Sequence, residues 1–327
     1  MADKHAPIAV LCSGGDSSGM NAATRAVVRT ALYHNVEIFG VARGYSGLIA
    51  GEIAPLTARS VSNTISRGGT FLRTARCQEF LQLEGRAKAA DQLRSHGIKG
   101  LITLGGDGTY RGAHCLAQEH PGLNIVGAPC TIDNDVNGTD LTIGYDTAVN
   151  VAMEAIDKIR DTAASHDRLF VVEVMGRHAG HIAIEVAIAS GAEEVLVPEV
   201  VEDLDAISER LANGRANGKT SSIVVIAEGE TQGNAHEIAK MLEERTGYEV
   251  RVSILGYIQR GGSPTATDRV LASRLGAAAV ELILDGESDV CVGMENDRVT
   301  VHPLPFAWEV KKAIDPERLR VLHMLAI

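Results

Sequence analysis

Short apolar runs alternate with helical patterns along most of this 327-residue chain, and this alternation constrains its fold more than any other feature. The runs are rich in Val, Ile and Leu and lie at residues 8–11, 100–104, 124–128, 169–175, 222–227 and 250–255. Continuous apolar runs of this length are typical of strands buried on both faces, as in a parallel sheet. Between them, apolar residues recur every three or four positions, at 149–159, 238–242 and 271–282. The sequence therefore predicts a doubly wound α/β fold.

Composition limits the class of protein. Asp and Glu number 42 and Lys and Arg number 31, which gives a formal net charge of −11, and aromatic residues make up only 4% of the chain. A nucleic-acid binder would carry a basic stripe and stacking aromatics, so we expect no nucleic-acid partner. No apolar segment approaches the roughly 18 residues of a membrane span, so we expect no membrane partner. The five cysteines are scattered without a C-x-x-C pair, which favours reduced thiols and a cytoplasmic location.

Two of the apolar runs stop at glycine-rich loops. The first is followed by residues 13–19 (SGGDSSG) and a helix expected from about Asn21, and the second by residues 105–109 (GGDGT). Glycine lets the backbone approach a ligand closely, and a helix N-terminus offers unpaired N–H groups to an anion. The first loop alone is equally compatible with a simple tight turn. In the second loop, Asp107 beside bound phosphates is typical of a carboxylate that holds Mg²⁺.

A pair of carboxylates follows the third run. Residues 131–135 read TIDND, so Asp133 and Asp135 lie two positions apart between a strand and a helix. Such a pair suggests a general base for a substrate hydroxyl and a ligand for a metal or substrate. We interpret Asn134 and Asp140 as members of an Asx-turn cluster.

Arginines gather at strand ends and beside glycines. Such positions suit bidentate contacts with phosphate. The six arginines are Arg73, Arg76, Arg168, Arg177, Arg251 and Arg260. A solvated ion pair remains the simpler interpretation of any one of them. Together they favour a phosphorylated substrate and a nucleotide.

These motifs together resemble the ATP-dependent 6-phosphofructokinase family. The matching blocks run in the family's order from residue 8 to about residue 276. They are SGGDSSGMNAATR, GGTFLRTARCQEF, LGGDGTYRGA, TIDNDVNGTDLTIGYDTA, VVEVMGRHAGHIA, IAEG and LGYIQRGGSPTATDR. The GGDGT block is weakly specific, because NAD kinases and lipid kinases carry a similar loop. The TIDND, MGRHAG and QRGGSP blocks in that order are highly specific.

The resemblance implies an architecture. It predicts two doubly wound, Rossmann-like three-layer domains with the active site in the cleft between them. Residues 1–144 plus about 259–308 would bind ATP and Mg²⁺. Residues from about 145–258 plus 309–327 would bind fructose 6-phosphate. The family usually forms a homotetramer with sites shared between subunits, and it transfers the γ-phosphoryl group of Mg-ATP to the 1-hydroxyl of fructose 6-phosphate.

The resemblance also implies roles for single residues. Asp133 would be the base, Thr131 and Arg177 further catalytic residues, and Asp107 the metal ligand with Asp135 nearby. The implied ATP-binding residues are Gly15, Arg76, Cys77, Gly106, Asp107, Gly108 and Thr109. The implied sugar-phosphate contacts are Thr131, Ile132, Asp133, Met175, Gly176, Arg177, Glu228, Tyr257 and Arg260, with Arg168 and Arg251 from a neighbouring subunit. Tyr257 stands where many bacterial members carry a His that contacts the 6-phosphate.

Two positions bear on the phosphoryl donor. Pyrophosphate-using relatives typically have Asp after the loop aspartate and Lys before TIDND, where this chain has Gly108 and Cys130. A side chain at position 108 would crowd the space needed for the nucleoside, so we expect ATP. The alternatives are a pyrophosphate-dependent phosphofructokinase and a catalytically weak sensor of sugar phosphates or nucleotides. An NAD kinase is a poorer match, because it has no use for the substrate-side motifs.

The family's effector site is only partly matched. The residues that fit are Arg25, Arg29, Arg160, Glu193 and Lys219. Regulated bacterial members carry basic residues where this chain has Ala58, Asn217 and Ser221. Loss of several cations weakens a phosphate site. We therefore expect weak or altered control by ADP and phosphoenolpyruvate.

Overall fold

The computed structural model describes residues 6–165 and 168–326. The chain divides into two compact units, each described here by itself. The first comprises Met1–Thr147 with Arg260–Lys312, and the second Ala148–Gln259 with Ala313–Ile327. No helix in the described part of the chain is both long and apolar enough to span a bilayer.

The first unit is built on a seven-stranded sheet with the order β11-β10-β5-β4-β1-β2-β3. The strands are β1 (Ile8–Cys12), β2 (Ile38–Val41), β3 (Ile53–Pro55), β4 (Gly100–Gly105), β5 (Asn124–Pro129), β10 (Val290–Glu295) and β11 (Arg298–Pro303). The five central strands are parallel, and β3 and β11 are antiparallel to their neighbours at the two edges.

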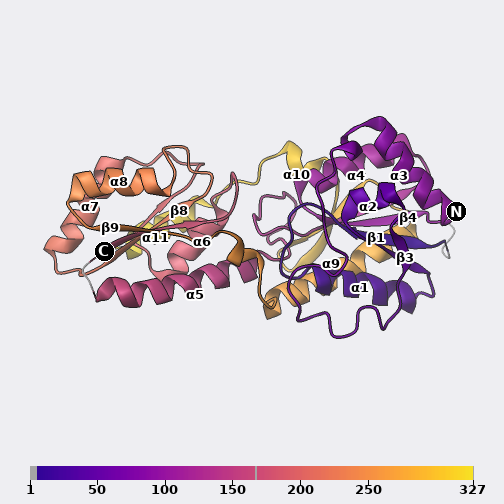
Figure 1. Ribbon diagram of the computed structural model, residues 1–327, viewed down its shortest axis with the longest axis horizontal. Helices are drawn as coiled ribbons and strands as arrows, with labels where there is room; N and C mark the ends of the chain where they lie inside the picture. Colours follow the sequence, from indigo (N-terminus) through magenta and orange to yellow (C-terminus); the bar gives the residue numbers. More distant parts are fainter. Residues whose placement is uncertain (1–5, 166–167, 327) are drawn as a thin grey trace. The chain divides into compact units, whose positions relative to one another are not determined.

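Helices cover both faces of this sheet (Figure 1). One face carries α1 (Met20–Tyr33) and α9 (Ala266–Asp285). The other carries α2 (Gly44–Ala50), α3 (Leu83–Ser95) and α4 (Asp107–Glu119), with the short helices η1 (Glu79–Leu81) and α10 (Phe306–Glu309) nearby. Val10 of β1 packs in one hydrophobic cluster with α1 and α9, whereas the next residue, Leu11, packs in a separate cluster with the helices of the opposite face. The predicted doubly wound arrangement is therefore confirmed for this unit.

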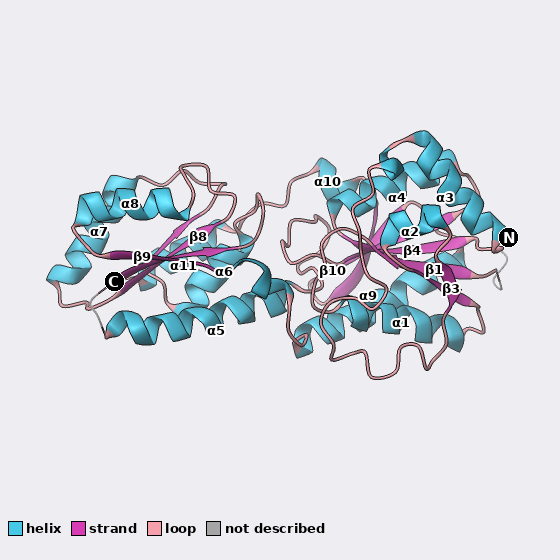
Figure 2. Cartoon of the chain, in the orientation of Figure 1, coloured by secondary structure: helices cyan, strands magenta, loops and turns pink. Residues whose placement is uncertain are grey.

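The second unit has a four-stranded sheet in which every pairing is parallel, in the order β7-β8-β6-β9. Its strands are β6 (Leu169–Val174), β7 (Glu194–Leu196), β8 (Ser222–Ala227) and β9 (Val250–Ile254). Its helices are α5 (Tyr145–Ala164), α6 (His181–Ser190), α7 (Leu204–Ala216), α8 (Ala235–Thr246), η2 (Gly256–Arg260) and α11 (Pro316–Leu325), of which α5 begins, and η2 ends, in the first unit. Figure 2 shows α7 and α8 on one side of this sheet and α5 and α6 on the other. This unit is therefore also three-layered.

All six predicted strands are present, and the predicted helices are α1, α5, α8 and α9. Gly247 ends α8 in the left-handed region (φ 68°), a backbone conformation that favours glycine. The apolar runs did not predict the remaining strands, which are β2, β3, β7, β10 and β11. The hairpin between β10 and β11 turns at Asn296 and Asp297, both with positive φ, a geometry that favours Asn and Asp.

Candidate active site

Three loops meet at the carboxyl ends of neighbouring strands in the first unit. Cys12 at the end of β1 pairs with Leu104 of β4, and Gly105 at the end of β4 pairs with Pro129 of β5. The backbone N–H of Ser13 donates to the carbonyl of Leu104 (3.0 Å), so the first loop lies against the second. The chain runs from β1 to β2 on one side and returns to β4 on the other, which makes this edge a topological switch point. Ligands of open α/β sheets bind at such edges.

The two glycines Gly105 and Gly108 of the second loop differ in whether the fold requires glycine. A Cβ at Gly105 would lie 2.3 Å from Oγ1 of Thr109 and 2.5 Å from the carbonyl O of Ser13, so close packing requires glycine. A Cβ at Gly108 would meet nothing within 4 Å, and its φ is not positive. Glycine inside a helix is less stable than alanine by about 1 kcal/mol. Because the fold does not need glycine at position 108, the open space beside it favours a ligand.

Arg260 is brought to the first loop. A Cβ at Gly15 would lie 3.0 Å from a terminal nitrogen of Arg260, and that nitrogen lies 3.8 Å from Oδ1 of Asp16. The Ser18 hydroxyl is within 3.1–3.2 Å of three successive carbonyls, of Arg260, Gly261 and Gly262. The QRGG block is therefore fixed beside the loop that follows β1.

The loop after β5 holds Asp133 in a buried position. Asp133 is 5% exposed, and its backbone N–H donates to Oγ1 of Thr131 (3.2 Å). Asn134, with φ 53°, accepts from the N–H of Thr142 (3.0 Å) and from Nζ of Lys312 (2.9 Å). The Asx turn expected at Asn134 is therefore wrong in detail, because its side chain bridges to distant backbone.

The same holds for Asp140, whose Oδ2 accepts from the N–H of Asn296 (2.8 Å). Cys130, immediately before this loop, is buried in the hydrophobic cluster under α1, and burial raises the pKa of its thiol well above its ordinary value. Cys130 therefore presents no charge to a ligand.

Asp107 begins α4 and lies partly exposed. Its Oδ1 accepts a hydrogen bond from Nε of Arg111 (2.6 Å), one helical turn further on. The described residues contain no group of three or more His, Cys, Asp and Glu able to enclose a metal. Mg²⁺ is usually bound through one or two carboxylates together with substrate phosphates. Asp107, an accessible carboxylate beside a phosphate-type loop, fits that mode of binding.

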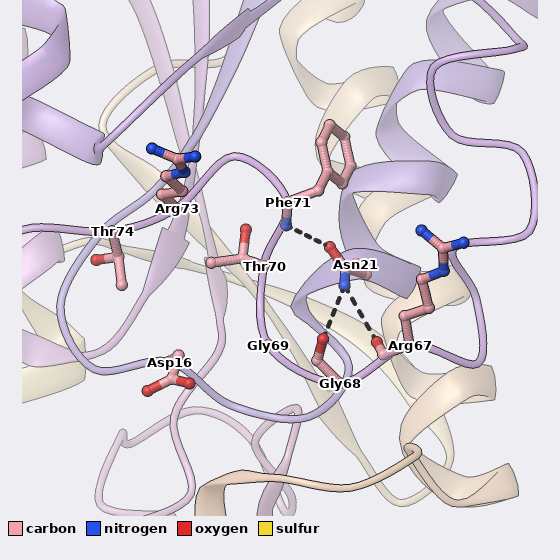
Figure 3. A pocket seen from close by; sticks show the side chains of 9 residues that line it. All are labelled: Asp16, Asn21, Arg67, Gly68, Gly69, Thr70, Phe71, Arg73 and Thr74. Atoms are coloured by element: carbon pink, nitrogen blue, oxygen red, sulfur yellow. Dashed lines mark hydrogen bonds between the residues drawn. The ribbon is translucent and has the colours of Figure 1, made fainter.

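A cavity of about 480 Å³ lies beside the first loop (Figure 3). Asn21 shapes it, because its Nδ2 donates to the carbonyls of Arg67 and Gly68 (both 3.1 Å) and its Oδ1 accepts from the N–H of Phe71 (2.8 Å). The Thr74 hydroxyl donates to the carbonyl of Gly14 (2.7 Å). These bonds hold the segment 67–74 against the first loop.

Arg76 and Cys77 follow that segment. Arg76 is exposed and makes no ion pair with any residue in 6–165 or 168–326. Cys77 is half-buried and packs against the cluster under α2, α3 and α4. The exposed guanidinium of Arg76, which follows the cavity-lining segment in the chain, is therefore available to a ligand.

The carboxyl ends of β6, β8 and β9 gather the second unit's expected site residues. Met175 donates its N–H to Oε1 of the fully buried Gln259 (2.8 Å), and the N–H of Glu228 donates to the carbonyl of Val174 (2.9 Å). A Cβ at Gly229 would lie 1.8 Å from the carbonyl O of Arg177, so the two loops touch.

Three expected sugar-phosphate contacts of this unit lie at its surface. Arg177 and Glu228 are exposed, and Tyr257 is 79% exposed. Arg177 has a left-handed backbone, with φ 54°. This edge of the second sheet therefore presents a cation, a carboxylate and a phenol to solvent.

Arg168 and Arg251 lie at the opposite end of this sheet. Arg168 precedes β6 and Arg251 lies near the amino end of β9, and both form ion pairs with Glu249 (3.1 Å from Arg168). A six-residue strand spans about 20 Å. One bound ligand cannot bridge these arginines and Arg177 within a single chain. The resemblance assigned Arg168 and Arg251 to the site of a neighbouring subunit, and that assignment stays a prediction.

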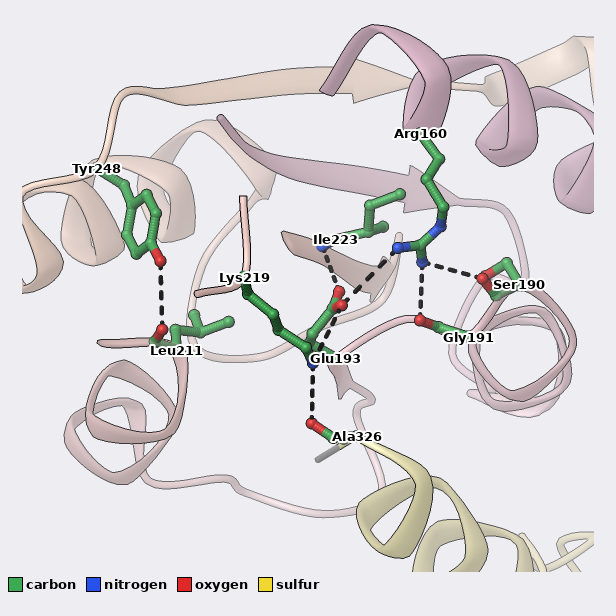
Figure 4. Close-up of polar contacts among 9 residues, drawn as sticks. All are labelled: Arg160, Ser190, Gly191, Glu193, Leu211, Lys219, Ile223, Tyr248 and Ala326. Carbon is green, nitrogen blue, oxygen red and sulfur yellow. Dashed lines mark hydrogen bonds and ion pairs between the residues drawn. The ribbon is translucent and has the colours of Figure 1, made fainter. Parts of the chain in front are cut away.

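Three of the expected effector residues form a cluster in the second unit (Figure 4). Glu193 is buried, accepts from the N–H of Ile223 (2.6 Å), and lies 3.8 Å from Arg160 and 3.5 Å from Lys219. Arg160 also donates to the carbonyl of Gly191 (2.7 Å), and Lys219 to that of Ala326 (3.2 Å). The adjoining cavity holds about 280 Å³. Both cations therefore already share one buried carboxylate of the protein and donate to its backbone.

The other two effector candidates, Arg25 and Arg29, belong to α1 in the first unit. Burial, with the neighbouring charge of Arg29 adding to it, lowers the pKa of the Arg25 guanidinium. These two arginines therefore lie in a different unit from the cluster around Glu193.

Sequence reasoning missed residues that support the site. Tyr45 donates its buried hydroxyl to the carbonyl of Thr109 (2.6 Å) and stacks on Phe80 at 3.8 Å between ring centroids. Asp268 is 1% exposed and accepts from the N–H groups of Gly144 (2.7 Å) and Thr147 (2.8 Å). Asp268 lies within the GGSPTATDR block, but nothing in one sequence distinguishes a buried anchor from a surface carboxylate. The contacts of Arg111 were also missed.

Comparisons with known proteins identify the family. A family model described as phosphofructokinase matches residues 7–283. The chain is 57% identical over 320 residues to the ATP-dependent 6-phosphofructokinase 1 of Thermus thermophilus, and the match covers 98% of this chain and 99% of that protein. It is 55% identical, with the same coverage, to the ATP-dependent 6-phosphofructokinase of Bacillus licheniformis.

Among solved structures, phosphofructokinase from Saccharomyces cerevisiae superimposes with a TM-score of 0.88 at 36% identity. The match covers 98% of this chain and 48% of the yeast chain, so this chain spans about half the yeast chain's length. The sequence blocks, the two parallel sheets and these relatives agree. The chain belongs to the phosphofructokinase family.

Proposed function

We propose that this protein transfers the γ-phosphoryl group of ATP to the 1-hydroxyl of fructose 6-phosphate. The observation that carries the proposal is the unfilled space at Gly108, where the fold does not need glycine, beside Asp107 and in the loop next to that of the buried Asp133. Two bacterial relatives of nearly the same length are named ATP-dependent 6-phosphofructokinases, which supports the same donor here.

On the nucleotide side, the first unit supplies backbone and charge. The N–H groups at the start of α4 and the positive end of that helix suit an anion. The proposed ATP contacts are Gly15, Arg76, Cys77, Gly106, Asp107, Gly108 and Thr109. Phosphoryl transfer depends mostly on positioning and charge neutralisation, which these groups provide.

Asp107 would hold Mg²⁺, as its accessible carboxylate and the absence of a closed metal cage among the described residues suggest. When bound, the metal neutralises phosphate charge. The protein's own part is to keep the Asp107 carboxylate at the first turn of α4, next to the loop after β1.

Asp133 is the proposed base for the sugar's 1-hydroxyl proton. Its loop is braced by Asn134, Thr142 and Lys312, which keeps the carboxylate from moving away from its working position. The uncharged hydroxyl of Thr131 accepts a hydrogen bond from the backbone N–H of Asp133, so we assign Thr131 a positioning role beside the reacting groups. A fixed base within hydrogen-bond reach contributes about 10²- to 10⁴-fold to a rate.

The sugar phosphate is proposed to contact residues from both units. From the second unit these are Met175, Gly176, Arg177, Glu228 and Tyr257, and from the first Thr131, Ile132, Asp133 and Arg260. Met1–Thr147 with Arg260–Lys312 would thus be the ATP-binding unit, and Ala148–Gln259 with Ala313–Ile327 the fructose 6-phosphate-binding unit.

Arg168 and Arg251 are proposed to complete the 6-phosphate site of a neighbouring subunit in a homotetramer. Their position at the amino end of β6 and β9, away from Arg177, supports a role in a different copy's site. Mixing Arg168→Ala with Asp133→Ser subunits tests this, because a hybrid site can combine an intact Asp133 with a neighbour's intact Arg168. Recovery of activity on mixing is expected, and no recovery would contradict shared sites.

Two further proposals concern context. All five cysteines are free, which supports a reducing compartment such as the cytoplasm. The engagement of Arg160 and Lys219 by Glu193 supports weak control by ADP and phosphoenolpyruvate. A steep fructose 6-phosphate curve that shifts strongly with either effector would contradict the second proposal.

The donor is tested by a coupled assay for fructose 1,6-bisphosphate. Purified protein, Mg²⁺ and fructose 6-phosphate are supplied with either ATP or pyrophosphate. We expect turnover with ATP alone. Turnover with pyrophosphate would contradict the donor assignment, and silence with both donors would favour a sensor of nucleotides or sugar phosphates.

A further inference from the structure

Arg111 makes contacts that the proposed reaction does not yet use. Its Nε donates to Oδ1 of Asp107 at 2.6 Å, and its guanidinium carbon lies 4.9 Å from the ring centroid of Trp308. Arg111 is exposed, and Trp308 is half-buried. The same cation therefore contacts the proposed metal ligand and an aromatic face.

Packing against neighbouring residues holds the Trp308 ring in place beneath this cation. It lies in α10, beside the buried Ala307, and its ring packs edge-on against His114 at 5.8 Å between centroids. His114 in turn contacts the carboxylate of Asp289 (2.8 Å), next to β10. A guanidinium that stacks on an anchored indole keeps its plane and position while its hydrogen-bond partners change.

The pairing with Asp107 weakens in the loaded site. A carboxylate that binds Mg²⁺ donates electron density to the metal and becomes a poorer acceptor for Arg111. The guanidinium, still stacked on Trp308, can then turn to phosphates bound at the start of α4. Arginine forms strong charge-assisted hydrogen bonds to phosphate.

We propose that Arg111 is a phosphate ligand for the metal–nucleotide complex, paired with Asp107 in the unloaded site and transferred to phosphate oxygens on loading. The inference rests on the proposed use of ATP. Because a charge-assisted hydrogen bond is made or lost, removal of the guanidinium weakens MgADP binding about 10- to 100-fold. Binding of adenosine, which has no phosphate, is unaffected.

The test uses Trp308, the single tryptophan of the chain, as a fluorescent reporter. Wild type and Arg111→Met, which keeps an unbranched stem, are titrated with MgADP, with ADP in EDTA and with adenosine. The matched control is Arg94→Met, which removes an exposed arginine of α3 that pairs with Asp91. Calorimetry gives each affinity independently of the fluorescence signal.

The proposal predicts that MgADP changes Trp308 emission in wild type and in Arg94→Met. In Arg111→Met the MgADP affinity falls about 10- to 100-fold, the emission change is lost, and the adenosine affinity is unchanged. The loss is smaller for ADP in EDTA, because Arg111 then stays with Asp107.

Three results would overturn the proposal in different ways. MgADP affinity unchanged or increased in Arg111→Met would show that Arg111 only neutralises or blocks Asp107. Equal losses for adenosine and MgADP would place Arg111 on the base rather than the phosphates. A wild-type protein that binds no MgADP would contradict the proposed function itself as well.

Discussion

The loop at the end of β4 and the cluster around Glu193 both matched family motifs, yet they differ in whether the protein already pairs their polar groups. At the β4 loop, the flank of Gly108 is open, and the N-cap residue of α4, Gly106, provides no side-chain cap. At Glu193, one buried carboxylate and main-chain carbonyls already accept from or pair with Arg160 and Lys219. A motif match thus locates a residue, but only its partners show whether its charge is available to a ligand.

The largest expected effect is at the open site. Asp133→Ser should lower turnover by about 10²- to 10⁴-fold, because it removes the proposed base. MgADP and fructose 6-phosphate should still bind, since the loop keeps its braces at Asn134 and Thr142. Steady-state kinetics and calorimetry measure the two properties separately. Near-normal turnover would exclude Asp133 as the base.

The next effect is on stability at the same loop. Gly105→Ala places a methyl group 2.3 Å from Oγ1 of Thr109 and 2.5 Å from a backbone oxygen. Overpacking of this kind costs about 1–3 kcal/mol, so urea unfolding should show a loss of that size. A variant as stable as wild type would mean that the loop adapts easily and that Gly105 carries no packing constraint.

Asp268, like Glu193, is a buried carboxylate whose partners are other groups of the protein, so it extends the comparison with the β4 loop. Asp268→Asn should lower the free energy of unfolding by about 1–3 kcal/mol, because an amide N–H₂ then faces a backbone donor. Burial raises the pKa of the Asp268 carboxyl above its unfolded value, despite bonds from Thr147 and Gly144. A raised carboxyl pKa stabilises the fold below the unfolded pKa, and this contribution is lost as pH rises through the folded pKa.

The difference in stability between wild type and Asp268→Asn should therefore narrow as pH rises from about 4 toward neutrality, where the reference carboxyl pKa is about 3.9. Urea unfolding at several pH values measures it. A gap that widens with pH would mean that the hydrogen bonds outweigh burial and that the folded pKa is lowered.

The smallest expected effect is at the cluster around Glu193. Glu193→Gln removes the anion shared by Arg160 and Lys219, so the affinity for phosphoenolpyruvate or ADP at that cavity should rise a few-fold. Ser208→Ala, also in the second unit and not among the residues that line the cavity, is a suitable control. Unchanged effector affinity, measured by calorimetry in the absence of substrate, would show that Glu193 is not what limits binding there.

Much of the fold could be predicted from the sequence because buried parallel strands appear in it as continuous apolar runs. The runs that became β1, β4, β5, β6 and β8 are mostly apolar on both faces, and each ends at a glycine or polar loop. The edge strand β9 is less buried, but its Val and Ile residues were enough to predict it. The hairpin β10–β11 was missed because alternate residues of its edge strand β11 face solvent. Strands β2, β3 and β7 are too short, at three or four residues, to show periodicity.

The candidate site could be predicted only in part from the sequence. Asp107 and Asp133 were predicted because they lie in loops that follow apolar runs and also belong to the family blocks. Partners distant in sequence left no such signal: Lys312 reaches Asn134, and Trp308 lies under Arg111. The assignment of Arg168 and Arg251 to a neighbouring subunit came from the family resemblance alone, because one sequence does not show which residues of another copy lie nearby.

The central claim, that the open flank of Gly108 is kept for the nucleotide, is tested most directly by Gly108→Asn. Asparagine adds volume without charge near the start of α4, where it meets no protein atom within 4 Å of its Cβ. The measurement is kcat/KM for ATP together with the free energy of unfolding. We predict an unfolding free energy within about 0.5 kcal/mol of wild type and a fall in kcat/KM of at least about 100-fold, equivalent to about 2.7 kcal/mol. A stable variant with wild-type kcat/KM would contradict the claim.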